Sequence, residues 1–356
     1  MAKKGTFQEV ARLAGVSGPT VSRVVTGRAR VSPEIADRVK RAAQQLGVDL
    51  FRGGRSKVIV FVLSNRDMLR SFHSHILVGT EAYCAARGWN TLFLTLRYLA
   101  GVPWKDLHLP PILERRDAVG GFVVAGTNFK NFLNLLDHKG LPFAVLGNNV
   151  VGEWKPDAHD VVWFDDIQGA YEMTHYVLSL GHRDLWYVGN MHLPWYLRRY
   201  KGYARAMEEV GLSPRVSDID SDNNGDIGFL ATKSILARRQ PVSAIFAGAD
   251  CAAEGVYRAL RDSGLHTPQD ISVAGFDDIE AAILHPHLTT VRVFTEQVGK
   301  RLAEMVLKRI ESPSAASRQF TIPTQLVRRE SCKPPSAAKE TYGGERLLQP
   351  ELTPAR

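Results

Sequence analysis

Beyond residue 57 the chain alternates short apolar runs, rich in β-branched and aromatic residues, with longer segments of helical character. This alternation predicts parallel sheets whose strands are joined by crossover helices. The predicted strands are residues 58–63, 91–96, 121–124, 143–146, 185–188, 244–247 and 271–275. Ligands of such sheets bind beyond the carboxyl ends of the strands, so we expect binding residues among the polar side chains that follow a strand.

The excess positive charge of the chain lies at its N-terminal end. Residues 1–57 hold 12 Lys or Arg and 4 Asp or Glu, whereas the rest of the chain holds 33 of each sign. A small basic module on a neutral body is typical of a nucleic-acid reader. A merely solvated basic tail would lack apolar periodicity, and this segment has it.

Three short helices are predicted within the basic segment. A capping box over residues 6–9 starts the first helix, and Gly15 marks the sharp turn after it. Ser17 caps a second helix that Gly27 ends, and Ser32 caps a third with an apolar face. Three helices of which the first two are joined by a tight turn make a helix-turn-helix.

The start of the second helix is the part that enters the major groove in this geometry. It carries Gly18, Pro19, Thr20 and Arg23, of which Gly18 and Pro19 offer no side-chain hydrogen bonds. Arg23 is therefore the predicted base reader, since its fork fits O6 and N7 of guanine; a phosphate contact or a plain surface charge is the alternative. Ser22, Thr26, Arg28 and Arg30 are placed to contact phosphates, and Thr6 and Ser17 complete the candidate DNA-binding set.

Polar and aromatic residues near three predicted strands form a candidate binding site in the body. Asp250 and Asp277 follow two strands, and Arg199 lies in the segment after a third. Two carboxylates and a guanidinium suit the hydroxyls of a sugar or the edge of a small polar metabolite. Trp195 and Phe72 could stack on such a ligand. Each residue also has a structural alternative, because an Asp that opens a helix is often an N-cap and Trp195 could belong to the core.

The sequence resembles the lactose and galactose repressor family, first in its headpiece and then, with interruptions, to about Lys333. The headpiece segments that carry the resemblance are residues 6–11, 14–17, 20–25 and 31–33. The body is similar to the family's periplasmic-binding-protein-like domain at Asp165, Gly169 and residues 180–183, 199–203, 275–278 and 288–291. The resemblance implies an α/β fold, in which a three-helix headpiece precedes a two-lobed domain with parallel sheets.

The resemblance also implies a function, which is that of a transcription regulator, as a repressor, whose DNA affinity is controlled by a sugar or related effector bound between the lobes. The implied partners are a near-palindromic DNA operator and a second copy of the chain in a homodimer. Arg199 and Asp277 match positions where family members bind effector, Phe72 and His73 match an aromatic pair of the first lobe, and Trp195 lies in a loop that adjusts specificity. The full effector-binding set is Phe72, His73, Asp165, Trp195, Arg199, Asp250 and Asp277.

Two departures from the family's pattern indicate an unusual ligand. Ala249-Asp250 stands where relatives have Asn-Asp, and Asp165-Asp166 replaces Asp-Asn. The linker departs as well, since the segment that forms a hinge helix in relatives is shortened and contains two adjacent Gly. Leu50 or Phe51 could still insert into the minor groove, or both could pack against the protein.

The expected domains are the headpiece at 1–50, a short linker at 51–57, the effector-binding and dimerisation domain at 58–333 and a disordered tail at 334–356. Lobe 1 is expected at 58–159 and 293–318, and lobe 2 at 160–292 and 319–333. No apolar run is long enough for a membrane helix and no secretion signal is present, so we expect a cytoplasmic protein.

Other classes of protein fit less well. An enzyme or a solute-binding receptor with an added DNA-binding module is the alternative, but the sequence has no phosphate loop, nucleophile elbow or metal-helix His pair. We therefore expect no enzyme activity, no cofactor and no metal. The three cysteines, Cys84, Cys251 and Cys332, have no metal-like spacing and fit free thiols.

Overall fold

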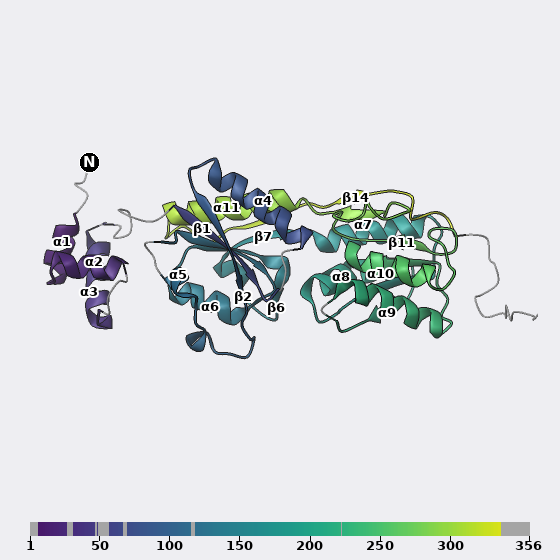
Figure 1. Ribbon diagram of the computed structural model, residues 1–356, viewed down its shortest axis with the longest axis horizontal. Helices are drawn as coiled ribbons and strands as arrows, with labels where there is room; N and C mark the ends of the chain where they lie inside the picture. The colour runs from purple at the N-terminus through teal and green to yellow at the C-terminus, as the bar shows by residue number, and fades with distance from the viewer. Residues whose placement is uncertain are drawn as a thin grey trace, which may run out of the picture. The chain divides into compact units, whose positions relative to one another are not determined.

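The computed structural model describes residues 6–26, 31–46, 48, 57–66, 70–114, 118–221 and 223–335. The chain divides into two compact units, each built from separate stretches of sequence (Figure 1). Unit 1 comprises Met1–Trp163 and Thr295–Ile322, and unit 2 comprises Phe164–Phe294 and Pro323–Arg356. In the part of the chain that the structure describes, no helix has the length and apolarity needed to cross a membrane.

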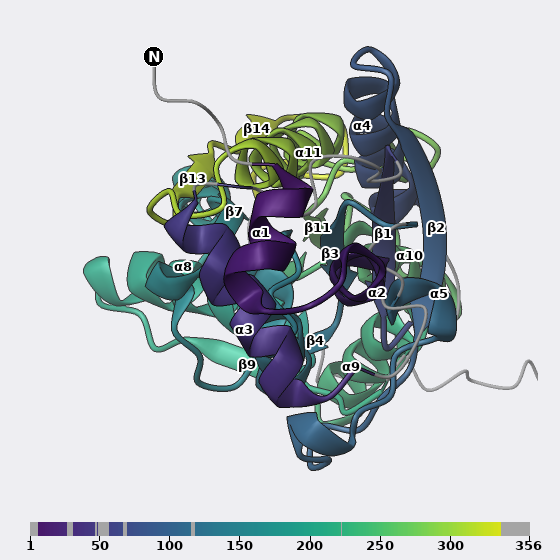
Figure 2. The same ribbon diagram turned by 90° about the vertical axis from the view of Figure 1, so that its left-hand side faces the viewer.

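The N-terminal helices are α1 (Phe7–Ala14), α2 (Gly18–Thr26) and α3 (Pro33–Gln45), shown in purple in Figure 2. Both halves of the predicted capping box at Thr6 and Glu9 are present. Gly15 takes the left-handed conformation, with φ 62°, where the chain turns out of α1. Val10, Val21 and Val39, one from each helix, are fully buried in a shared core. The predicted helix-turn-helix is confirmed.

The rest of unit 1 is built on a six-stranded sheet with the order β13-β7-β5-β3-β1-β2. Its strands are β1 (Val58–Ser64), β2 (Asn90–Leu96), β3 (Gly121–Gly126), β5 (Phe143–Leu146), β7 (Asp160–Phe164) and β13 (Gln319–Ile322). The neighbouring strands β2 and β1, β1 and β3, β3 and β5, and β5 and β7 are all parallel, as expected for strands joined by crossovers. The short elements are β4 (Asn128–Phe129), β6 (Val150–Val151), η1 (Trp104–Asp106), η2 (Gly147–Asn149) and η3 (Pro156–Ala158).

The helices of this part of unit 1 are α4 (Ser71–Ala85), α5 (Pro111–Glu114), α6 (Lys130–His138) and α11 (Thr295–Glu311). Helices α4 and α11 approach closely through two glycines. A Cβ atom on Gly79 would lie 2.0 Å from the carbonyl oxygen of Glu296, and one on Gly299 would lie 1.9 Å from that of Ile76. Larger side chains at Gly79 and Gly299 would therefore force the helices apart.

Unit 2 contains a four-stranded sheet with the order β11-β10-β8-β9 and parallel pairs throughout. Its strands are β8 (Leu185–Gly189), β9 (Arg215–Asp218), β10 (Ala244–Ala247) and β11 (Ser272–Ala274). Its helices are α7 (Asp166–Ser179), α8 (Pro194–Glu209), α9 (Asn224–Ala237) and α10 (Asp250–Arg261). A two-stranded antiparallel ribbon of β12 (Thr290–Arg292) and β14 (Gln325–Val327) completes it. The predicted α/β class with parallel sheets is confirmed.

Candidate functional sites

One face of α2 is polar and open to solvent. Gly18, Pro19, Ser22 and Arg23 are exposed, whereas Val21 is fully buried in the core of the three helices. Residues 22 and 23 lie about one helical turn after residues 18 and 19, so all four side chains fall on one side of the helix. The candidate base reader Arg23 therefore shares a face with three of the other candidate DNA-binding residues.

The start of α2 is held by two hydroxyl side chains. The Oγ of Ser17 lies 2.8 Å from Oγ1 of Thr20 and accepts a hydrogen bond from the Thr20 amide at 3.4 Å. Thr6 holds the start of α1 in a similar way, since its Oγ1 accepts from the Glu9 amide at 3.3 Å. Ser17, Thr20 and Thr6 thus stabilise the two helix N-termini at which they lie.

Arg38 of α3 closes the turn between α1 and α2. Its Nη2 donates to the carbonyl oxygens of Ala14 at 2.5 Å and Gly15 at 3.3 Å. A guanidinium at these carbonyls also suits the negative end of the α1 dipole. Sequence reasoning missed Arg38, because no local pattern connects it to a turn more than 20 residues earlier.

The remaining headpiece predictions cannot be placed. Arg28 and Arg30 lie outside the described residues, as do Leu50 and Phe51 and the linker around them. Thr26 ends α2, but its side chain is outside the described part as well.

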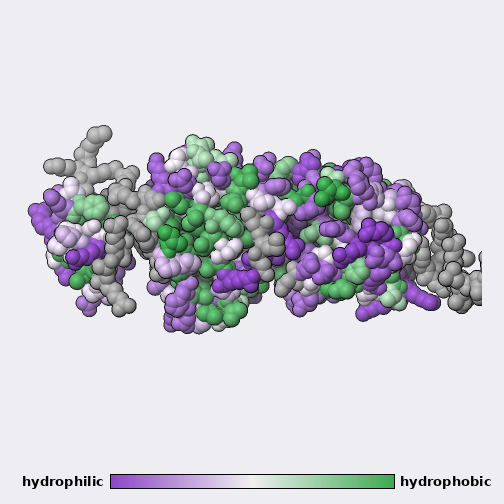
Figure 3. All heavy atoms as spheres, viewed as in Figure 1, coloured by the Kyte–Doolittle hydropathy of each residue, from purple (hydrophilic) through white to green (hydrophobic). Residues whose placement is uncertain are grey.

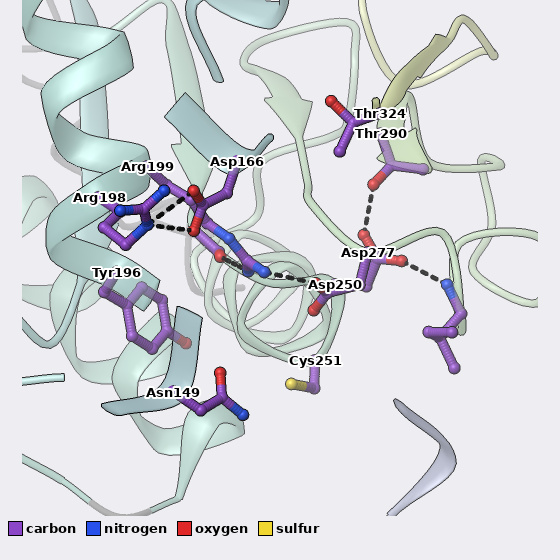
Figure 4. Close-up of polar contacts among 12 residues, drawn as sticks. Asn149, Asp166, Tyr196, Arg198, Arg199, Asp250, Cys251, Asp277, Thr290 and Thr324 are labelled. Atoms are coloured by element: carbon purple, nitrogen blue, oxygen red, sulfur yellow. Dashed lines mark hydrogen bonds and ion pairs between the residues drawn. The ribbon is translucent and has the colours of Figure 1, made fainter. Parts of the chain in front are cut away.

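In unit 2, the buried Arg199 of α8 and the partly buried Asp277 form an ion pair (Figure 4). The Arg199 side chain is 2% exposed, and its Nη2 donates to Oδ1 of Asp277 at 2.7 Å. Its Nη1 donates to the carbonyl oxygen of Gly248, and its Cζ lies 3.9 Å from the centre of the Phe276 ring. These contacts fix the guanidinium plane, so the predicted pairing of Arg199 with Asp277 has a defined geometry.

The backbone at Asp277 is strained. Asp277 has φ 119° and Asp278 has φ 56°, in the region that favours glycine. Burial raises the pKa of Asp277 to about 6, against the opposing effect of the Arg199 guanidinium. Strained backbone and a perturbed carboxyl group in the same residue are typical of a functional site.

Asp250 is fully buried and engaged on both oxygens. Its Oδ1 accepts from Oγ1 of Thr290 at 2.6 Å, and its Oδ2 accepts from the amide of Ile279 at 2.9 Å. Burial, together with the charge of Asp277, raises the pKa of Asp250 well above its usual value. Asp250 therefore ties α10 to β12 and to the strained segment after β11.

Asp165 and Trp195 have structural contacts of their own. The Oδ1 of Asp165 accepts from the amide of Gln168 at 3.2 Å and caps α7. Trp195 is buried in the first turn of α8, beside the Tyr196 ring. Asp166, which the sequence prediction left out, is fully buried and accepts from Nε of Arg198 at 2.8 Å.

The two candidate residues of unit 1 lie in the first turn of α4. The rings of Phe72 and His73 meet edge to face, with centres 5.3 Å apart. The Nε2 of buried His73 lies 3.3 Å from Nδ2 of Asn149. Burial, and then the charge of Arg66, lower the pKa of His73 to about 3, so the imidazole is neutral at physiological pH.

Within the described ranges, no group of three His, Cys, Asp or Glu side chains could hold a metal ion. The three cysteines are free thiols; Cys84 and Cys332 are buried and Cys251 is partly buried.

Comparison with known proteins gives matches over both parts of the chain. Residues 6–48 match the model of bacterial regulatory proteins of the lacI family, and residues 174–332 match a periplasmic binding protein-like domain. The HTH-type transcriptional repressor PurR of Vibrio campbellii is 29% identical over 340 residues, which cover 92% of this chain and 98% of that protein. The HTH-type transcriptional regulator CelR of Thermobifida fusca is 28% identical over 341 residues, with the same coverage.

Solved structures are similar as well. A CelR–cellobiose complex has a TM-score of 0.68 and 28% identity, and covers 92% of this chain and 99% of its own. A lac repressor dimer bound to operator has a TM-score of 0.64 over 93% of this chain and 100% of its own; at 20% identity it shows the shared fold. The family, the fold class and the regulatory function predicted from the sequence are confirmed. The headpiece is thus similar to the lacI family of bacterial regulatory proteins and the body to a periplasmic binding protein-like domain; like the PurR and CelR proteins that it matches, the chain is a DNA-binding transcription regulator and not an enzyme.

Proposed function

We propose that this regulator represses transcription from a near-palindromic operator as a homodimer in the cytoplasm, and that a small-molecule effector changes its affinity for DNA. The observation that carries the effector part is the ion pair of Arg199 and Asp277, which follows strand ends in a parallel sheet. CelR, a relative, has been solved with cellobiose bound. This complex supports a sugar or a related polar metabolite as the effector.

The exposed face of α2 is the proposed DNA-reading surface. Arg23 reads a base, while Ser22, Thr26, Arg28 and Arg30 contact phosphates. The excess charge of residues 1–57 supports this assignment, because cationic side chains release counterions from the DNA backbone. Ser17 and Thr6 stabilise the starts of the two helices, and their hydroxyl groups also contact DNA phosphates.

The proposed dimer contact involves β2, the edge strand of the unit 1 sheet. Leu92 and Phe93 of β2 are each 38% exposed, and Figure 3 shows hydrophobic side chains gathered over this edge. Exposed edge strands are normally blunted by charge or covered by a partner. A second copy of the chain is the proposed cover, because a two-fold dimer presents two headpieces to two half-sites.

The test is footprinting on DNA that the full-length protein selects from genomic fragments. We expect one discrete protected site with two related half-sites, and a change in affinity when a metabolite that raises the melting temperature is added. Protection without any discrete site would contradict the proposal.

Two variants separate the two proposed sites. Asp277→Asn should protect the same DNA as the wild type but lose the response to the effector. Arg23→Ala should show the reverse, with weaker site selection and an unchanged thermal shift by the effector. If both variants lose both properties together, the two sites are not independent and the assignment is wrong.

A further inference from the structure

Unit 2 contains buried polar atoms that lack a partner within the protein. In its described residues, 164–221, 223–294 and 323–335, the buried side-chain atoms without a hydrogen bond are the Tyr196 hydroxyl, Nε of Arg199 and Oδ1 of Asn224. Buried polar groups are almost always paired, because an unpaired one costs folding free energy. Three exceptions in one unit call for a physical explanation.

The three atoms belong to elements that begin at the same edge of the sheet. Tyr196 and Arg199 lie in the first two turns of α8, which follows β8. Asn224 is the first residue of α9, which follows β9. Because β8 and β9 are parallel neighbours, their carboxyl ends share one edge, and this is the edge where ligands of α/β sheets bind.

Tyr196 and Arg199 are three residues apart and so share one face of α8. The Tyr196 ring is fixed in place against the ends of β8 and β10. A Cβ atom on Gly189 would lie 2.5 Å from Cδ1 of Tyr196, and one on Gly248 would lie 2.4 Å from it. Tyr196 is fully buried, and its carbonyl oxygen accepts from the Tyr187 hydroxyl at 2.9 Å. The position of the Tyr196 hydroxyl is therefore set by packing.

Asn224 is also held in one orientation. Its Nδ2 donates to Sγ of Cys251 at 3.0 Å, at the start of α10, which leaves Oδ1 as the unpaired acceptor. The edge thus presents one donor from Arg199, one acceptor from Asn224, and a Tyr196 hydroxyl that can do either. The charge of Arg199 is already matched by Asp277.

Resting on the effector site proposed above, we propose that Tyr196 and Asn224 contact the effector beside Arg199, and that the effector is a neutral polyhydroxyl compound. A hydroxyl group donates and accepts at once, so neighbouring hydroxyls satisfy all three atoms. A carboxylate or phosphate only accepts, so it would leave Oδ1 of Asn224 facing another acceptor. It would also meet a guanidinium whose charge is already paired.

The first test needs no ligand and compares two buried tyrosines. In the ligand-free full-length protein, Tyr196→Phe removes an unpaired hydroxyl and should leave the melting temperature unchanged or raise it. The matched control Tyr187→Phe removes a hydroxyl that makes a hydrogen bond and should lower the melting temperature. An equal loss in the two variants would overturn the proposal, because it would give the Tyr196 hydroxyl a structural partner.

The second test identifies the class of ligand. Thermal shift is measured with a panel of neutral mono- and disaccharides that includes D-ribose and cellobiose, with glucose 6-phosphate and hypoxanthine as the anionic and purine probes. We expect at least one neutral sugar to raise the melting temperature. In calorimetry, Tyr196→Phe should weaken the binding of that sugar about 10-fold, the usual order for one hydrogen bond.

Two outcomes would overturn the inference, and they separate it from the proposed function. If hypoxanthine or glucose 6-phosphate alone raises the melting temperature, the ligand class is wrong; loss of that response in Asp277→Asn would leave the proposed effector site standing. If no compound of the panel has an effect, the result counts against both. An unchanged affinity of Tyr196→Phe for a sugar that binds would remove Tyr196 from the site.

Discussion

The guanidinium of Arg38 in α3 donates to the carbonyl oxygen of Ala14 at 2.5 Å, and so joins the third headpiece helix to the turn before the second. The contact fixes the direction in which α2 leaves the turn. Arg38→Met should therefore weaken operator binding by about 1 to 2 kcal/mol through loss of charge-assisted hydrogen bonds. Lys40→Met is the matched control, because it removes the same charge from the same helix at an exposed position. If Arg38→Met and Lys40→Met lose the same operator affinity in an equilibrium binding assay, Arg38 contributes only through its charge.

Arg23 should determine preference at one base pair. Arg23→Ala is expected to cost about 1 to 3 kcal/mol on the selected operator and to relax preference at a single position. Arg28→Ala, a predicted phosphate contact, should weaken binding to every sequence alike and lower the salt dependence. The affinities of the two variants and the wild type are compared by competition binding with operators that differ at single base pairs. If Arg23→Ala ranks all variants as the wild type does, Arg23 does not read a base.

The pair of Arg199 and Asp277 should respond differently to two kinds of substitution. Arg199→Ala leaves the partly buried carboxylate of Asp277 unpaired and should destabilise the protein by up to about 3 kcal/mol. Asp277→Asn keeps the shape of the side chain and should retain the fold while it weakens effector binding. Calorimetry with a bound sugar, together with chemical unfolding, distinguishes the two effects. Unchanged affinity in Asp277→Asn would exclude the carboxylate from the site.

His73 should make unit 1 sensitive to acid. The native pKa of about 3 lies below the unfolded value of 6.5, so between these values the unfolded chain holds a proton that the native protein lacks. Stability should therefore fall as the pH drops from 6.5 towards 3, by about 3 kcal/mol by pH 4. His73→Gln should reduce this slope in urea unfolding followed as a function of pH. Parallel pH profiles for the variant and the wild type would show that His73 does not cause it.

The contact between α4 and α11 should depend on Gly299. A methyl group there would meet the carbonyl oxygen of Ile76 at 1.9 Å, so Gly299→Ala should cost about 1 to 3 kcal/mol through overpacking. Gly101→Ala is the control, because a Cβ atom at Gly101 has no neighbour within 4 Å. Thermal unfolding of the two variants gives the comparison. Similar melting temperatures would mean that the helices separate at little cost.

Much of the fold follows from local patterns. The strand β1 was predictable because its buried residues form a continuous apolar run, and α1 because Thr6 and Glu9 form a capping box. Strands β7 and β9 were missed. The first contains a short apolar run at residues 161–164, between acidic residues, and could have been predicted, whereas the second, Arg215–Asp218, has no apolar run and does not stand out from its surroundings. Their pairing comes from neighbouring strands.

The candidate site could be predicted only in part. Arg199 and Asp277 were found because each follows a strand and matches a family position. The roles of Asp250, Tyr196 and Asn224 depend on contacts with residues distant in the sequence. The oxygens of Asp250, for instance, are taken by groups 29 and 40 residues further along the chain. No spacing rule in the sequence could indicate these partners.

The glycine contact between α4 and α11 also sets an order of events during synthesis. The α11 segment, Thr295–Glu311, leaves the ribosome only after the long stretch Phe164–Phe294 of unit 2 has been made. At ordinary elongation rates this is a delay of roughly ten seconds. The three headpiece helices draw their core from residues 10–48 alone, so they can fold during that interval. A nascent chain would thus carry a finished DNA reader before α4 has received its partner helix.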